Sequence, residues 1–195
     1  PKGSGEIKEI SPSKQKTTFA FEKEHNSSWY KLIINVSGEL TMNVIPTKAD
    51  DDYDFMLFKS GKTNFCDSLQ KYKINPIRAC ISRDKEELNG KTGLNYKSKN
   101  EFVKHGVGAA YCKSLNVKKG EIYYLVLDNV YEKGDGHTLE FEISQPVVFK
   151  GTVTDDNNKA IKTEIALTNQ KGDTVLLEKT ADDGSYSFIA PLTKN

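Results

Sequence analysis

The chain has 195 residues, of which 28 are Lys or Arg and 27 are Asp or Glu, so its net charge is +1. This balance gives no long-range field that would attract nucleic acid or an anionic membrane. Hydrophobic residues make up 36% of the chain, which favours a packed core over disorder. No run approaches the about 18 apolar residues that a membrane helix needs, so we expect no membrane span.

The beginning of the chain predicts a polar segment followed by alternating strands. Residues 1–16 are rich in Lys, Ser and Gly, and we expect them to be flexible. Residues 29–36 and 40–45 alternate between apolar and polar side chains, which is typical of strands with one buried face. Leu32 and Ile34 lie on the more apolar face of the first of these segments and are predicted to point into the core.

The middle of the chain is less regular. Residues 55–58 predict a strand, but residues 59–105 lose the alternating pattern, and long segments of this kind tend to be functional or cross-linked. Residues 121–128 then form the most hydrophobic predicted strand, and residues 138–143 alternate again. We therefore predict a first β-sandwich domain over residues 17–145.

After Gln145 and Pro146 the pattern changes to short strands about ten residues apart, separated by clusters of Asp, Asn and Gly. The predicted strands are residues 147–154, 161–168, 174–180 and 186–190. Evenly spaced short strands favour a sandwich or barrel over alternating strands and helices. The sequence thus predicts an all-β chain with a second, small sandwich domain over residues 146–195.

An acidic loop is the first candidate site. Asp50, Asp51, Asp52 and Asp54 place four carboxylates within five residues. Ca²⁺ takes six to eight oxygen ligands, and a cation relieves the repulsion between clustered carboxylates. Asp128 ends a predicted strand and would join this set if the fold brings it close. The alternative is a solvated turn whose Asp side chains accept hydrogen bonds from the backbone, and calcium is the only cofactor we predict.

Aromatic side chains supply a candidate carbohydrate-binding surface. Trp29 lies on the more polar face of its strand, and Tyr72 and Tyr96 lie among lysines in the irregular middle segment. An exposed arrangement of these rings would suit a sugar. The alternative is that Trp29 packs beneath the middle segment and that the lysines are simply solvated.

No catalytic motif supports an enzyme, and we predict a non-catalytic protein. The chain lacks G-x-S-x-G and H-E-x-x-H, and His25, His105 and His137 are isolated from one another. His105 and Cys112 could be imagined as a base and a thiol, but a Cys that follows Ala-Ala-Tyr is more typical of a small apolar core residue.

Four segments resemble the jelly-roll domain known as the bacterial pre-peptidase C-terminal domain, in its cell-envelope version. They are SWYKL at residues 28–32, GELT at 38–41, DDYDFML at 51–57 and GEIYYLVLDN at 120–129. The resemblance covers about residues 17–144 and implies a jelly-roll-type sandwich.

The three cysteines, Cys66, Cys80 and Cys112, leave the disulfide pattern open on sequence alone. Cys66 and Cys80 enclose 13 residues, and either a bridge between them or three unpaired thiols fits the sequence. The resemblance favours a Cys66–Cys80 bridge, because the cell-envelope version of the domain often carries a Cys pair in its long middle segment. Cys112 would then be buried, or would pair in place of one of the others.

Two further segments, GTVTD at residues 151–155 and DDGSYSF at 182–188, resemble the carboxypeptidase-regulatory-like, transthyretin-like β-sandwich, an immunoglobulin-like architecture. Members of that family usually continue with a final hairpin, so we expect this domain to be incomplete.

Together the two resemblances imply an extracytoplasmic protein of the periplasm, outer membrane or cell surface. The expected function is a spacer, adhesion or recognition module of a larger OmpA-like, outer-membrane-associated protein. Its expected partners are envelope proteins or polysaccharide, with self-association through an exposed edge strand as a further expectation. The alternatives are a calcium-dependent polysaccharide-binding module and an accessory domain of a secreted hydrolase.

Overall fold

The structure is a computed structural model that describes residues 21, 25–61, 64–70, 74–82, 89–106, 108–131, 134–145 and 147–190. Its secondary structure in this part is almost entirely β, with one short helix, α1 (Phe65–Gln70), so the predicted all-β class is confirmed. The described part contains no helix long and apolar enough to cross a membrane. The fold divides into two compact units, Pro1–Ile143 and Ser144–Asn195.

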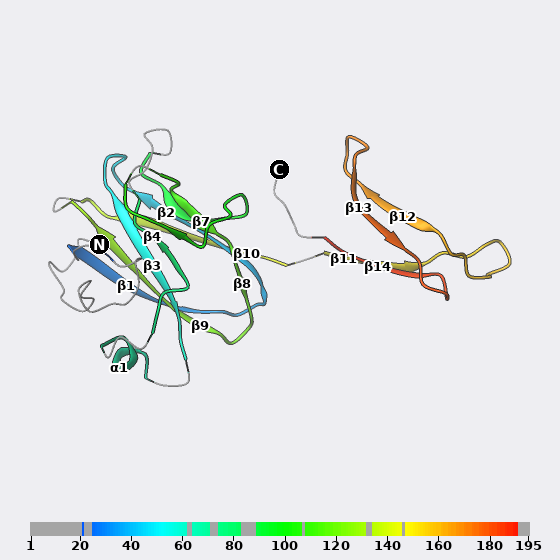
Figure 1. The fold of residues 1–195 in the computed structure, drawn as a ribbon, viewed down its shortest axis with the longest axis horizontal. Helices are drawn as coiled ribbons and strands as arrows, with labels where there is room; N and C mark the ends of the chain where they lie inside the picture. The colour runs from blue at the N-terminus through cyan, green and yellow to red at the C-terminus, as the bar shows by residue number, and fades with distance from the viewer. Residues whose placement is uncertain are drawn as a thin grey trace. The chain divides into compact units, whose positions relative to one another are not determined.

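The first sheet of the first unit has five strands in the order β1 (Asn26–Ile33), β9 (Ile122–Asn129), β3 (Tyr53–Lys59), β4 (Arg78–Cys80) and β6 (Phe102–Val103) (Figure 1). β9 pairs antiparallel with both β1 and β3, and it is apolar on both faces. A strand with two apolar faces must be covered on both sides, which explains the two clusters described below.

The second sheet faces the first and consists of β10 (His137–Ser144), β2 (Gly38–Pro46), β5 (Thr92–Asn95) and β7 (Tyr111–Lys113), with β8 (Leu115–Val117) also paired to β2. Leu40, Met42 and Val44 alternate along β2 and are all buried. β2 therefore has one face in the core and one nearer solvent, as its alternating sequence predicts.

The main core fills the space between the two sheets. Its largest buried members include Phe55, Leu57, Leu94, Leu125 and Leu127. We call the second group of buried side chains, on the opposite face of the first sheet, the outer cluster. It comprises Phe21, Met56, Phe58, Phe65, Leu69, Ala79, Ile81 and Val126. α1 supplies Phe65 and Leu69, so this short helix covers the outer face of the sheet.

The second unit contains two pairs of antiparallel strands. β11 (Val147–Thr152) pairs with β14 (Ser185–Ala190), and β12 (Glu164–Thr168) pairs with β13 (Thr174–Lys179). Gly184 adopts a φ of +74°, and a Cβ there would lie 2.4 Å from the carbonyl oxygen of Val153, so only glycine fits this turn.

The irregular middle segment contains more structure than its sequence predicts. It holds the helix α1 and the strands β4, β5 and β6. The three strands are only two to four residues long, so an alternating pattern does not reveal them. β4 pairs with β6 and β5 with β7, both in parallel, so their partners are distant in sequence. The predicted flexible segment 1–16 lies outside the described residues.

Candidate functional site

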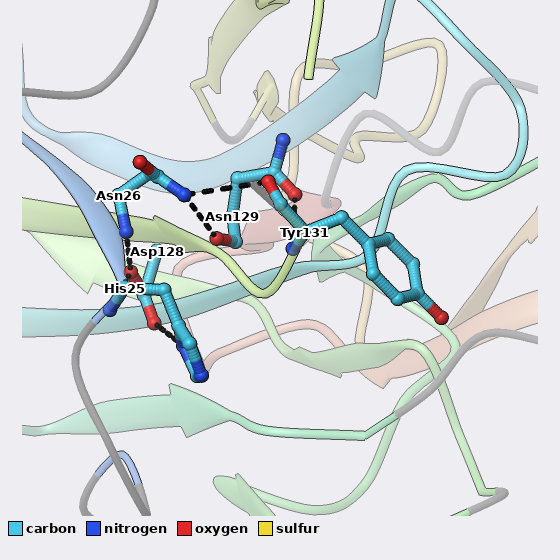
Figure 2. Close-up of polar contacts among 5 residues, drawn as sticks. All are labelled: His25, Asn26, Asp128, Asn129 and Tyr131. Atoms are coloured by element: carbon cyan, nitrogen blue, oxygen red, sulfur yellow. Dashed lines mark hydrogen bonds and ion pairs between the residues drawn. The ribbon is translucent and has the colours of Figure 1, made fainter. Parts of the chain in front are cut away.

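A polar group of the first unit lies where β9 ends and β1 begins, and Figure 2 shows its five members. Asp128 is fully buried, and its Oδ1 atom accepts hydrogen bonds from the backbone amides of His25 (2.9 Å) and Asn26 (2.8 Å). Its Oδ2 atom lies 2.9 Å from Nδ1 of His25. Since β9 and β1 pair with Ser27 opposite Asp128, the carboxylate sits beside the first residues of β1 and fixes them.

Neighbouring amide groups complete this junction. The Nδ2 atom of Asn26 donates to the carbonyl oxygens of Asn129 (3.4 Å) and Tyr131 (3.3 Å), and the amide of Tyr131 donates to Oδ1 of Asn129 (3.0 Å). The Tyr131 ring points away from the other four side chains in Figure 2 and is exposed. We call these five residues the Asp128 junction; its contacts hold strand ends together.

The His25–Asp128 pair has the orientation of a base held by a carboxylate. Nucleophilic catalysis also needs a Ser, Thr or Cys within hydrogen-bond reach of the other ring nitrogen. No side chain of these types donates to the His25 ring among the hydrogen bonds of the described residues. Both oxygens of Asp128 are engaged, Oδ1 by the amides of His25 and Asn26 and Oδ2 by the His25 ring, so the arrangement orients the backbone where β1 begins.

A second polar group lies nearby, on β1, β3 and β10. The hydroxyl of Tyr30 lies 2.8 Å from Nε2 of His137, and the rings of Tyr53 and His137 meet edge to face at 4.9 Å. Burial raises the pKa of Tyr53 to about 12, and the negative charge of Asp51 adds to this shift. Burial also lowers the pKa of His137, which favours its neutral form.

Four buried polar atoms of the described residues lack a hydrogen-bond partner: Oγ of Ser27, Nε1 of Trp29, Oδ2 of Asp51 and Nδ1 of His137. Such atoms are rare in folded proteins because each forgoes a hydrogen bond that water would supply. Ser27 lies opposite Asp128 in the pairing of β1 with β9, so unpartnered buried atoms accompany both polar groups described above.

The predicted calcium set is not assembled as a site. Asp54 lies directly opposite Asp128 in the pairing of β3 with β9, but both oxygens of Asp128 are turned to β1. Asp51 is buried, whereas Asp50 is exposed. The described residues contain no group of three His, Cys, Asp or Glu side chains that could hold a metal ion. Calcium binding by the acidic loop stays a prediction, which calorimetric titration with Ca²⁺ would test.

The predicted Cys66–Cys80 bridge is absent, and all three cysteines are free thiols. The reason is positional. Cys66 lies exposed on α1, outside the first sheet, whereas Cys80 lies on β4 with its side chain in the main core. Cys80 instead shares the main core with Cys112, whose thiol donates to the carbonyl oxygen of Ala79, the residue before Cys80, at 3.2 Å.

Of the candidate sugar-binding aromatics the structure describes Trp29, on the first sheet, and Tyr96, directly after a strand of the second sheet. Trp29 packs against the outer cluster, where its ring stacks on Phe58 at 6.2 Å and meets Phe65 edge to face at 6.2 Å. This is the packed alternative for Trp29, beneath the middle segment. Tyr96 follows β5 and is 37% exposed, and Tyr72 lies outside the described residues.

Two polar groups were missed by sequence reasoning. At the start of β9, the carboxylate of Glu121 accepts hydrogen bonds from Nζ of Lys59 (2.5 Å), the hydroxyl of Tyr123 (2.6 Å) and the amide of Lys118 (2.9 Å). These contacts, led by Lys59, lower the pKa of Glu121 to about 2. The signal in the sequence is Glu121 in the Gly-Glu turn before β9, at the start of the segment that carries the jelly-roll resemblance.

Arg78 is the other. It is buried on β4, and it donates to the carbonyl oxygens of Lys113 (2.8 Å, from Nε) and Ser114 (3.0 Å, from Nη2) in the second sheet. Its Nη1 atom donates to the carbonyl of Ile77 and lies 3.4 Å from a carboxylate oxygen of Glu101. An arginine between Ile77 and Ala79 in a short apolar run was the available signal.

The second unit exposes several large apolar side chains. Val148 is 54% exposed and Ile189 63%, while Val175 is 54% exposed and Leu177 57%. Phe188 is the large apolar side chain that this unit buries in its described part. We call Val148, Ile189, Val175 and Leu177 the apolar surface of the second unit.

Comparisons with protein-family models, with curated proteins and with solved structures gave no match.

Proposed function

We propose that this chain is a non-catalytic, extracytoplasmic module of the bacterial cell envelope that recognises another protein surface through its second unit. The observation that carries the proposal is the apolar surface of that unit. Burying a Val, Leu or Ile side chain contributes about 1.5–3 kcal/mol relative to leaving it in water. Four such side chains exposed on a small unit favour its association with another protein surface that would cover them.

The arrangement of these side chains suits a sheet-like partner. Val148 lies directly opposite Ile189 in the pairing of β11 with β14, so the two side chains share a face. Val175 and Leu177 are two residues apart on β13 and also share a face. Each pair therefore offers a flat apolar strip rather than an isolated side chain.

The strands of the second unit also offer hydrogen-bonding edges. In the described residues they form two separate pairs, so each strand pairs along one side only. An unpaired edge accepts a further strand through its backbone groups, and apolar side chains on the same strands then determine specificity. The partner that fits is a β-rich protein, and a second copy of this chain is the first to examine.

The first unit is proposed to act as a spacer. Its apolar side chains fill two clusters within itself, so it is a rigid body that can position the second unit. The location at the cell envelope is supported by the resemblance of residues 28–32 and 120–129 to the pre-peptidase jelly roll and of residues 182–188 to the transthyretin-like sandwich.

The test is sedimentation of the full chain over a range of concentrations. We expect the unmodified chain to self-associate and the double variant Val175→Lys, Leu177→Lys to remain monomeric, because two charges would enter the apolar surface. The matched control is Thr152→Lys, Thr174→Lys, which adds the same charge at two exposed polar positions of the same unit. A strict monomer at every concentration would argue against pairing between copies.

The location needs a separate experiment. The complete open reading frame, tagged and expressed in its source bacterium, should appear in the periplasmic or outer-membrane fraction. Recovery with cytosolic marker proteins would contradict the proposed location and leave the binding test unaffected.

A further inference from the structure

Two buried cysteines approach each other across the sandwich. Cys80 lies on β4 in the first sheet and Cys112 on β7 in the second, and they are 1% and 0% exposed. The thiol of Cys112 donates to the carbonyl oxygen of Ala79 at 3.2 Å, and the thiol of Cys80 donates to the carbonyl oxygen of Ala110 at 3.5 Å. Each sulfur thus lies against backbone close to the other cysteine, since Ala79 directly precedes Cys80 and Ala110 lies two residues before Cys112.

This approach is fixed by contacts that do not involve sulfur. Arg78, two residues before Cys80, donates to the carbonyl of Lys113, which directly follows Cys112, and to that of Ser114. The hydroxyl of Thr92 donates to the carbonyl of Ala110 at 2.5 Å. The Arg78 bonds join β4 to the end of β7 across the sandwich, and the Thr92 bond holds the residue before β7 against β5, so the folded sandwich keeps the two cysteines close to each other.

We propose that Cys80 and Cys112 form a disulfide that joins the two sheets when the chain folds in an oxidising compartment. A disulfide needs two sulfur atoms that can come into bonding distance without backbone movement. Both sulfur atoms lie in the main core, and each contacts backbone within two residues of the other cysteine. The geometry lies in the interior of the first unit, whereas formation of the bridge in the cell rests on the proposed extracytoplasmic location; the refolding test below does not depend on that location.

The reaction is thiol–disulfide exchange with a disulfide oxidant, such as an oxidised dithiol oxidoreductase or oxidised glutathione. One cysteine thiolate attacks the oxidant and forms a mixed disulfide, and the second cysteine displaces the remaining half. The Cys80–Cys112 bond forms, and the oxidant's disulfide is reduced to two thiols that take up the two electrons and the two protons.

Access determines when this happens. Both sulfur atoms are buried in the folded sandwich, so an oxidant reaches them during folding or through local opening. Cys66 is exposed on α1 and remains a single thiol. Because burial keeps the oxidant from both sulfur atoms, the folded, reduced pair reacts slowly.

The test is a peptide map of the full chain. The reduced, unfolded chain is refolded in a glutathione redox buffer, its remaining thiols are alkylated, and it is digested with trypsin without reduction. We expect residues 79–83 to be joined to residues 105–113, and residues 63–71, which contain Cys66, to be alkylated. Alkylation of both Cys80 and Cys112, or a bridge to Cys66, would overturn the proposal.

Thermal unfolding supplies a second measurement. Cys66→Ser retains both bridge cysteines, and its oxidised form should melt roughly 10 °C above its reduced form, as expected for a bridge that closes a loop of about 30 residues. Cys112→Ser should melt at the same temperature under both conditions. Equal melting temperatures for the two forms of Cys66→Ser would contradict a bridge in the native geometry, and the peptide map needs neither variant.

Discussion

A carboxylate with no exposed surface must be paired, and the donors that it finds decide its role. Asp128 finds two backbone amides and an imidazole nitrogen at the beginning of β1. A calcium ion would use the same oxygen atoms, which is why the sequence alone did not distinguish a metal ligand from a residue that fixes a strand. The role of Asp128 depends on which segment folds against the end of β9. That segment is β1, which lies about a hundred residues earlier in the chain, so no local sequence pattern indicates it.

Asp128→Ala should lower the free energy of unfolding by about 3 kcal/mol, because it removes a charged acceptor and leaves two amides without a partner. Asp128→Asn should cost less, since its amide oxygen still accepts one of these bonds. Urea unfolding followed by the fluorescence of Trp29, the single tryptophan, measures both. The control is Asp50→Asn, an exposed aspartate of the same unit, and it should leave the midpoint unchanged. An unchanged midpoint for Asp128→Ala would contradict the structural role.

Glu121 gives a prediction for acid pH. Its pKa is lowered in the folded chain from 4.5 to about 2, chiefly by Lys59. A lowered carboxyl pKa contributes stability that is present above pH 4.5 and is lost as the pH falls toward 2, because the unfolded chain takes up the proton first. Glu121→Gln should therefore flatten the loss of stability over this range, measured by urea midpoints at successive pH values. A parallel decline in both proteins would contradict the assignment.

Elements of different length were predictable to different degrees. β2 and β9 were expected from sequence because eight or nine residues are enough to reveal an alternating or continuous apolar pattern. β4 has three residues and β6 has two, so no periodicity can appear in them. Their position is set by pairing and by the Arg78 side chain, which acts between the sheets and leaves no local pattern.

Arg78→Ala should cost about 3 kcal/mol of unfolding free energy, since two carbonyl oxygens of the second sheet would lose a charged donor in the interior. Arg78→Lys should recover only part of this, because a single ammonium cannot span the carbonyls of Lys113 and Ser114 as the planar guanidinium does. Lys113→Ala is the control, since its side chain is exposed and its carbonyl remains. Equal stability of Arg78→Ala and Lys113→Ala in urea would show that Arg78 does not hold the sheets together.

At the scale of the whole molecule, apolar burial is unevenly divided. Both clusters of the first unit are built from residues before 144, whereas the second unit buries Phe188 and leaves its apolar surface in water. The change from long alternating strands to short ones at Gln145 was visible in the sequence, and the chain divides next to it. The number of apolar residues in the second unit did not reveal their exposure, because exposure depends on whether a second layer covers them.

This division predicts that the first unit folds alone. A chain ending at Gln145 should keep the free energy of unfolding that Trp29 reports in the full chain, to within about 0.5 kcal/mol, because no member of either core cluster is removed. Trp29 packs against the outer cluster, so its fluorescence follows the first unit only. The second unit should unfold at lower urea in the full chain, as followed by amide hydrogen exchange of β11–β14, since little apolar area holds it together. A single transition shared by both units, or loss of cooperative unfolding in the shortened chain, would mean that the first unit depends on the second for its stability.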